Sequence, residues 1–455
     1  MMDLRRVFTL AGLCVALGAA GCGPGPEATE LPERVLVVAV ESLSPEQVDR
    51  MLADDRLPVL GRLIEQGARA RLVAPDPLDP AMLWATAFTG KKAREHEMMG
   101  EFVTLPSGKR SLPPSSMRQS KTFLQIAGDA GLTVVGVGLP FSWPAEVHNG
   151  ALVTPQVAPN RWTETAEHSF EAEPGVMSTY PPELYRDVAP LIRSIDDLPR
   201  ETATSLFRLN ESEYRMLYDE PLGSIYELEN PLRDIGLTLQ RDQSFVDVTA
   251  MLSEQYRPDV AALHLELLEP VQRVYWPFAR PERYPTTPAE SRRRFRDTVA
   301  AAYRRVDTQI GELLGTLPEG STVCVVGQRG FGDGPDPRDP DGGRPVPQPT
   351  NETMMVLWGR GVERGVDLGR AQLIDVTPTL LRLMGVHLGS DMSGRVLRDA
   401  LLDAFEQANP ERTLASHDED WDPSQRYPEA PGAPVQEGTS LPAPETPTPD
   451  EGKTP

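Results

Sequence analysis

The stretch VLVVAVESLSPEQ, residues 35–47, decides the fold. Its first six residues are all apolar and four of them are valine, which is typical of a central parallel strand covered on both faces. Ser44-Pro45-Glu46-Gln47 then supplies a helix cap, a proline at the first helical position and a capping-box glutamine. A buried strand that leads directly into a helix indicates an α/β fold.

The same alternation continues along the chain. We expect a second short helix that ends at Gly67 as a left-handed stop, followed by a strand over Ala68–Val73. The later elements that we expect are strands over 132–138, 259–268, 322–326 and 353–358, a long amphipathic helix from about 290 to 314, and a helix from 377 to 385. Strands that alternate with helices imply right-handed crossovers and a mostly parallel sheet.

Composition excludes some classes of protein. The chain has 455 residues with a net charge of −22, so nucleic acid is not an expected partner. The three cysteines are Cys14 in an apolar leader, Cys22, and Cys324 inside a predicted buried strand. No sensible pair remains, and a disulfide framework is therefore excluded.

The N-terminus has the pattern of an export signal. Arg5 and Arg6 precede a short apolar run, and Ala19-Ala20-Gly21-Cys22 resembles the bacterial lipoprotein box, in which the cysteine receives lipid. An ordinary cleaved signal or an uncleaved anchor is the alternative. We expect export and a lipid anchor at Cys22 that holds the protein to a membrane of the bacterial cell envelope, on the periplasmic or outer surface.

These patterns predict four segments. Residues 1–21 form a signal peptide, 22–33 a tether, 34–404 the folded domain with a polar helical insertion at about 160–245, and 405–455 an acidic, proline-rich tail. The loss of large apolar residues is most complete from Asp418 onward, where the chain cannot bury a core.

Four collinear blocks resemble the type I phosphodiesterase and nucleotide pyrophosphatase branch of the alkaline phosphatase superfamily. The blocks are residues 35–72, LWATAFTGKKAREHEMMGEF at 83–102, residues 122–153, and GSTVCVVGQRGFGDG at 320–334 combined with DVTPTLLRLMGVHLGSDMSGRVL at 375–397. The resemblance implies a three-layer, alkaline-phosphatase-like α/β domain with a central, mostly parallel sheet and a helical insertion. It also implies phosphoester cleavage with two zinc-like ions.

At the positions of the family's first set of metal ligands, this chain has other residue types. The aspartate after the first strand corresponds to Glu41, and the late Asp-His pair corresponds to Gln328-Arg329. The nucleophile position falls on Pro80, and a shift of one residue offers only Asp79. The resemblance therefore implies that no ordinary nucleophile is present.

The second group is altered in the same way. Its aspartate and histidine fall on Glu269 and Arg273, and the final histidine should lie near Pro349 or Thr350, where there is none. The six histidines of the chain include no close pair with metal-ligand spacing. The sequence therefore predicts that no metal cofactor is used.

Two arginines replace expected ligands, and a guanidinium does not bind cations. We hypothesise that Arg273 and Arg329 form salt bridges with Glu41 and Glu269 in the space of the ions, and that the site retains weak affinity for a phosphate-type anion. The alternative is that a register error places both arginines in solvent.

Other motifs carry less weight. His96 follows the family's histidine position without its glycine and is predicted to be a structural hydrogen-bonding residue, and His264 a satisfied core or edge residue. Gly136-Val137-Gly138 lacks a helix-opening glycine, so it is no dinucleotide loop. The acidic loop 333–343 matches no standard calcium loop, and a mobile loop is the preferred interpretation.

The sequence therefore predicts an exported lipoprotein with a phosphodiesterase-like fold and no catalysis, which binds an anion or a protein partner. The first alternative is an active phosphodiesterase or phosphatase with an altered metal site. The second is a hydrolase of sulfate or phosphonate esters.

Overall fold

The structure is a computed structural model. It describes residues 29–100, 103–104, 110–111, 113–146, 148–158, 177–218, 231–336, 345–419 and 421. The predicted signal peptide with Cys22, most of the tether, the end of the tail and most of the acidic loop 333–343 lie outside the described residues. In the described ranges, no helix has both the length and the apolar character that a bilayer-spanning segment needs.

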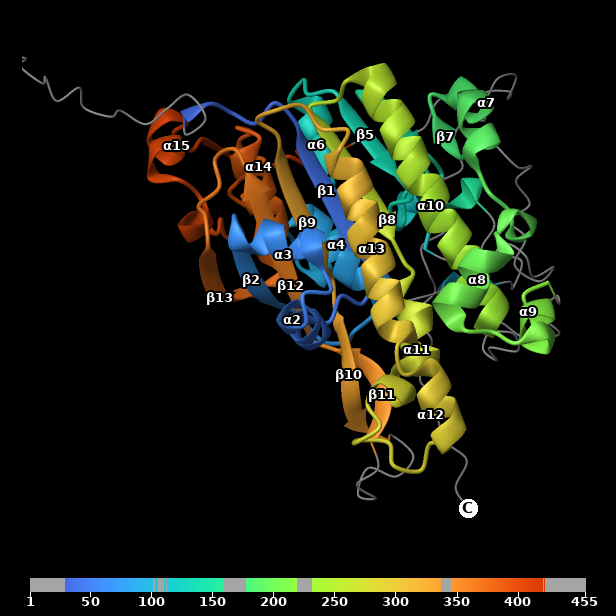
Figure 1. The fold of residues 1–455 in the computed structure, drawn as a ribbon. Helices are drawn as coiled ribbons and strands as arrows, with labels where there is room; N and C mark the ends of the chain where they lie inside the picture. The colour runs from blue at the N-terminus through green and yellow to red at the C-terminus, as the bar shows by residue number, and fades with distance from the viewer. Residues whose placement is uncertain are drawn as a thin grey trace, which may run out of the picture.

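The centre of the molecule is one large sheet (Figure 1). Its strands are β1 (Val35–Val40), β2 (Ala68–Val73), β5 (Val134–Val137), β6 (Gly150–Val153), β7 (Thr179–Tyr180), β8 (Val260–Leu265), β9 (Thr322–Gly327), β12 (Glu352–Gly359) and β13 (Val366–Gln372). In the described part of the chain they form nine strands in the order β13-β2-β12-β9-β1-β8-β5-β6-β7. The five strands from β9 to β6 are parallel, whereas β12 and β7 are antiparallel to their neighbours.

Helices cover both faces of this sheet, which makes the three layers that the sequence predicted. One face carries α2 (Pro45–Ala53), α3 (Pro58–Glu65), α10 (Pro231–Tyr256), α11 (Leu268–Ala279) and α13 (Thr298–Leu314). The other face carries α4 (Pro80–Thr89), α6 (Phe123–Asp129) and α14 (Val376–Leu383). The predicted fold class is confirmed.

Smaller elements lie around these layers. The remaining helices are α5 (Ala93–His96), α7 (Tyr185–Val188), α8 (Arg200–Phe207), α9 (Glu211–Met216), α12 (Ala289–Phe295) and α15 (Asp403–Ala408). The remaining strands pair as β3 (Val103–Thr104) with β4 (Arg110–Ser111), β10 (Gly330–Pro335) with β11 (Pro345–Thr350), and β14 (Leu388–Gly389) with β15 (Thr413–Leu414). Figure 1 shows α7, α8 and α9 together beyond α10, at one edge of the sheet.

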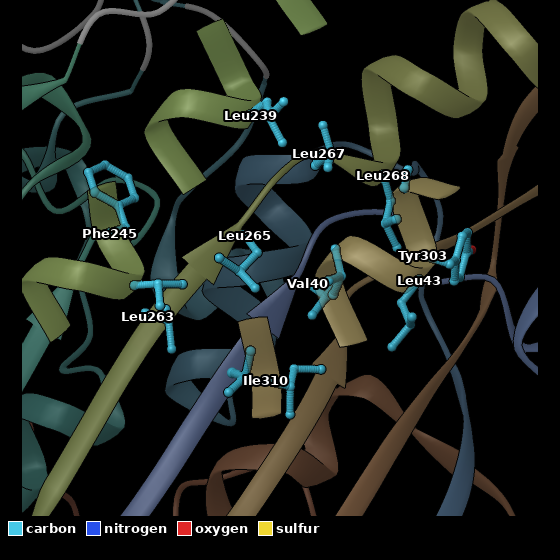
Figure 2. Packing of buried hydrophobic residues seen from close by; sticks show 14 of the residues in the cluster. Val40, Leu43, Leu239, Phe245, Leu263, Leu265, Leu267, Leu268, Tyr303 and Ile310 are labelled. Carbon is cyan, nitrogen blue, oxygen red and sulfur yellow. The ribbon is translucent and has the colours of Figure 1, made fainter. Parts of the chain in front are cut away.

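The strand β1 belongs to two cores at once. Leu36, Val38 and Val40 join the cluster beneath α10, α11 and α13, part of which Figure 2 shows, and the alternate residues join the cluster beneath α4 and α14. Successive strand side chains point to opposite faces, so a strand with two cores must be apolar at every position. This is why the apolar run of residues 35–40 indicated a central strand of an α/β fold.

Some local predictions were wrong. Ser44 is the N-cap of α2 but its side chain makes no capping hydrogen bond, so the predicted capping box is not formed. Gly67 is not left-handed; a Cβ there would lie 2.1 Å from the carbonyl oxygen of Leu357, so close approach of the backbone requires the glycine.

Two predicted boundaries also differ. The helix expected over 290–314 is divided into α12 and α13, and between them Asp297 accepts hydrogen bonds from Arg56, at 2.5 Å, and Arg304, at 3.3 Å. The segment predicted as a tail from residue 405 contains β15 and most of α15, and Asp418 within it accepts a hydrogen bond from Lys91 at 2.6 Å.

Candidate functional site

A cavity of about 160 Å³ opens where β1 and β8 end. Glu41 follows β1 directly, His264 and Glu266 flank the end of β8, and Arg329 follows β9. In open α/β sheets ligands bind at the carboxyl ends of parallel strands, since the loops that follow the strands converge there. This cavity is therefore the candidate functional site.

Glu41 lies in the charged base of the cavity, called the floor below, and both of its carboxylate oxygens have hydrogen-bond or ion-pair partners. One carboxylate oxygen accepts a hydrogen bond from Nε1 of Trp84 at 2.8 Å and lies 3.2 Å from Nε2 of His264. The other accepts from the Gln328 amide and lies 3.3 Å from Nη2 of Arg329. Burial opposes ionisation of Glu41, but the hydrogen bond from His264 and the charge of Arg329 outweigh it and lower its pKa.

Glu269 faces the same arginine from the first turn of α11. Nη2 of Arg329 lies 3.4 Å from its Oε1, and Arg273, one helical turn further along α11, pairs with the same oxygen. The hydroxyl of Ser42 donates to its Oε2. Nη1 of Arg329 donates to the carbonyl of Leu78 at 2.7 Å, so this guanidinium is held between both carboxylates and the backbone.

His264 carries a charge within this network. It is 3% exposed, with Nε2 facing Glu41 and Nδ1 3.3 Å from Oε1 of Glu266. Burial opposes protonation, but the contacts with Glu266 and Glu41 outweigh it and raise the pKa of His264 to about 9. The residue is therefore an imidazolium at neutral pH, a charge state that the prediction of a satisfied core or edge residue did not address.

The helix α10 supplies the other side of the floor. Arg241 pairs with Glu266, and Asp242 accepts the backbone N–H groups of Glu266 at 3.0 Å and of Leu267 at 2.9 Å. Burial raises the pKa of Asp242 to about 6. These contacts fix the backbone that follows β8, and with it the position of His264.

The position expected for a nucleophile carries none. Pro80 lines the cavity as the first residue of α4, and the Asp79 carboxylate caps that helix by accepting from the N–H of Met82 at 2.9 Å. Among the described residues that line the cavity, Thr238 is the only one with a hydroxyl, and it donates to the carbonyl of Asp234 in its own helix at 2.7 Å.

The walls of the cavity are apolar and rigid. Trp84, Phe141 and Trp143 line it together with several prolines, which are Pro80, Pro113, Pro114, Pro140, Pro155 and Pro270. Above the charged floor, such walls favour a ligand with an apolar or aromatic part.

The charges of the lining are balanced. The acids are Glu41, Asp234, Glu266 and Glu269, and the cations are Arg241, Arg273, Arg329 and the protonated His264. Arg241 and Arg329 are nearly buried, whereas the side chain of Arg273 is 44% exposed. A charged group of a ligand therefore meets Arg273 first.

The structure brings the residues that were selected from the sequence to one place. Glu41, Pro80, Glu269, Arg273 and Arg329 line the cavity; Gln328 contacts Glu41 directly, and Asp79 lies beside Pro80. Pro349 and Thr350 instead lie in β11, paired with Phe331 and Gly330.

Three site residues escaped sequence analysis. His264 and Glu266 could have been found, because β8 pairs in parallel with β1 and its last residues must lie beside Glu41. Arg241 left no such signal, since only the packing of α10 on β8 brings it to the site.

Comparisons with known proteins agree with this architecture. The family model described as type I phosphodiesterase / nucleotide pyrophosphatase matches residues 35–366. A search of curated proteins found no significant match.

Solved structures include similar folds. Wild-type alkaline phosphatase PafA is 11% identical, with a TM-score of 0.50 over 82% of this chain and 100% of that chain. Phosphonoacetate hydrolase from Sinorhizobium meliloti 1021, solved with phosphonoformate, is 15% identical with a TM-score of 0.38, covering 68% of this chain. The chain spans only 59% of the length of that hydrolase. At these identities the likeness to PafA shows a shared fold alone.

The prediction that no cofactor is used is corrected by the family match, because the family is one of metal-dependent hydrolases. The residues described here do not fit the pair of ions that the family uses. Arg329 lies between Glu41 and Glu269, and no group of three or more His, Cys, Asp or Glu side chains in the described ranges is placed to hold a metal ion.

The resemblance inferred from sequence is confirmed at the level of the family. The family model covers far more than half of the chain, and the sheet, the helical layers and the cavity at the strand ends accompany it. The chain belongs to the type I phosphodiesterase / nucleotide pyrophosphatase family.

Proposed function

We propose that this chain is a non-hydrolytic member of its family, which binds a phosphate-type anion with an apolar substituent in the cavity at the ends of β1 and β8. The absence of a free hydroxyl or thiol among the described lining residues carries this proposal, with Pro80 at the expected nucleophile position. Covalent phosphoester cleavage needs an activated nucleophile, and a proline ring supplies none.

The charged residues of the cavity floor support binding of an anion rather than hydrolysis of a phosphoester. Arg329 makes ion pairs with Glu41 and Glu269 at once, so one fixed cation neutralises part of the charge of both buried acids. Arg273 has exposed guanidinium surface, suited to an oxyanion. Trp84, Phe141 and Trp143 would accept the apolar substituent.

An aryl phosphodiester tests both parts of the proposal. With bis(p-nitrophenyl) phosphate we expect saturable heat of binding in calorimetry and no release of nitrophenolate, whether zinc or manganese is added or not. Arg273→Met should weaken binding about tenfold, since one charge-assisted contact is lost. Arg293→Met, an exposed arginine outside the cavity lining, is the matched control.

The alternative is an active phosphoester hydrolase with an altered metal site. Metal-dependent nitrophenolate release that disappears in Glu41→Ala and Glu269→Ala would establish this alternative and overturn the proposal. Absence of binding, together with absence of turnover, would also overturn it.

We further propose that the protein is an exported lipoprotein anchored through Cys22. The basic leader, the apolar run and the small residues before Cys22 support this. In a bacterial host, we expect the wild-type chain in the detergent phase of a phase partition with a lipid mass increment on its N-terminal peptide. Cys22→Ala should remain in the aqueous phase or retain its leader. A wild-type N-terminal peptide that carries no lipid mass increment would contradict the anchor.

A further inference from the structure

A second cavity, of about 560 Å³, lies between the start of α2 and the β10–β11 hairpin. It is at the far end of α11 from the first cavity, since Glu269 lies in the first turn of that helix and Arg280 follows its last residue. Of the positions that the resemblance assigned to the metal site, Thr350 lines this cavity, and Glu41, Glu269, Arg273, Gln328 and Arg329 do not.

Arg280 is the unusual residue of this cavity. The residue is 2% exposed, and neither Nη1 nor Nη2 makes a hydrogen bond. Its guanidinium carbon lies 4.6 Å from the ring centre of Trp276, and Nη2 lies 3.3 Å from Oε1 of Glu46, an ion-pair contact without hydrogen-bond geometry. A buried guanidinium with unsatisfied donors is costly, and it is a strong recognition group for any oxyanion that reaches it.

The other charged groups of the cavity have better partners or greater exposure. Arg283 lies 3.3 Å from Asp333, which also accepts hydrogen bonds from Trp276 at 2.8 Å and Tyr284 at 2.7 Å. The remaining pairs are Arg71 with Asp49 at 2.5 Å and with Glu352 at 3.9 Å, and Arg50 with Glu46 at 3.4 Å, while Glu282 is exposed. Arg280 alone among these lining arginines is fully buried.

Among the described residues, Glu46 is the only carboxylate that forms an ion pair with Arg280, and this ion pair is weak. Its side chain is 69% exposed, and the same Oε1 atom is shared between Arg50 and Arg280. A carboxylate with this exposure loses little when it moves fully into solvent, provided that a ligand oxyanion takes its place beside the buried Arg280.

We propose that this cavity is a second anion site, in which a small oxyanion of carboxylate or phosphate type displaces Glu46 and pairs with Arg280. Two oxygens on one centre match the two unsatisfied nitrogens of the guanidinium. Arg50 and Arg283, both partly exposed, flank the entrance. The site is independent of the proposed function, because it shares no lining residue with the first cavity.

Calorimetric titration of the full chain with inorganic phosphate and, separately, with acetate tests the proposal. The chain carries Arg273→Met to weaken the first cavity, and chloride keeps the ionic strength constant. We expect a single site for at least one probe; acetate binding would point to a carboxylate ligand, and phosphate binding alone to a phosphate ligand.

Three further variants decide the assignment. Arg280→Met should weaken the affinity about tenfold or more, Glu46→Gln should strengthen it several-fold by removing the competing carboxylate, and Arg293→Met should leave it unchanged. Glu46→Gln alters an exposed residue, so it remains informative if Arg280→Met does not fold. The proposal is overturned if neither probe binds. It is also overturned if Glu46→Gln leaves the affinity for the probe unchanged or lowers it.

Discussion

Arg329 shows how one side chain changes the chemistry of a site. Its guanidinium lies 3.3 Å from Glu41 and 3.4 Å from Glu269, so both acids are engaged from one position. Guanidinium stays protonated and offers no lone pair, so it satisfies these carboxylates without being able to activate a nucleophile. Pro80, which lines the same cavity, has no hydroxyl or thiol that could act as a nucleophile.

His96 is a residue whose protonation state depends on its buried environment. It is fully buried, its Nδ1 accepts from the N–H of Met98 at 3.0 Å, and its Nε2 lies 3.1 Å from the hydroxyl of Thr86. Burial, with the charge of Arg118, lowers the pKa of His96 to about 4. The predicted structural role of this histidine agrees with that environment, because the neutral ring uses one nitrogen as acceptor and the other as donor.

This depressed pKa leads to a prediction about acid stability. The unfolded chain binds a proton near pH 6.5 and the folded chain only near pH 4, so His96 contributes stability above 6.5 that is lost as the pH falls towards 4. The loss should be of the order of 3 kcal/mol. Denaturant unfolding should show this loss as a difference in the free energy of unfolding between wild type and His96→Gln, which narrows as the pH falls from 6.5 towards 4. A difference that does not vary with pH would contradict this role.

At the scale of elements, α10 depends on close contact with the loop after β5. Gly138 has a φ of +67°, and a Cβ at this position would lie 2.3 Å from the ring of Phe245, which projects from α10. The glycine therefore serves both the left-handed turn and the approach of the helix. Since α10 also carries Arg241, this packing places part of the cavity floor.

We therefore expect Gly138→Ala to destabilise the protein by roughly 2–4 kcal/mol, through backbone strain and overpacking together. Gly131→Ala is the matched control, because Gly131 has a φ of +91° but nothing within 4 Å of the added Cβ. It should cost only about 1–2 kcal/mol. Thermal and denaturant unfolding measure both; equal losses in the two variants would show that contact with Phe245 is unimportant.

At the scale of the whole molecule, charge limits the possible partners. The net charge of −22 creates a negative field around the protein, and the local arginines of both cavities are largely paired with acids. Small anions can reach a cavity through local contacts, whereas an extended polyanion must face the field of the entire surface.

Nucleic acid should consequently not bind. Fluorescence anisotropy of labelled single-stranded and duplex DNA should show no saturable change at about 0.15 M salt, where the screening length is about 8 Å. A basic DNA-binding protein under the same conditions controls for the probe. Saturable binding that weakens with added salt would show a basic surface that the overall charge conceals.

Much of the fold was determined by the sequence alone. The apolar run over residues 35–40 and the later strands predicted a mostly parallel sheet between helical layers, because burial on both faces leaves no room for polar positions. The proposed replacement of metal ligands at Arg273, Gln328 and Arg329 rests on the residue types at these positions.

Only the tertiary structure decided how these residues act together. The sequence does not show that His264 lies between Glu41 and Glu266 as an imidazolium, or that Arg280 is buried without hydrogen bonds at Nη1 and Nη2. Both depend on distances between segments far apart in the chain and on the exclusion of water. The charge on a buried group is set by its neighbours in space, and strand order and helix packing choose those neighbours.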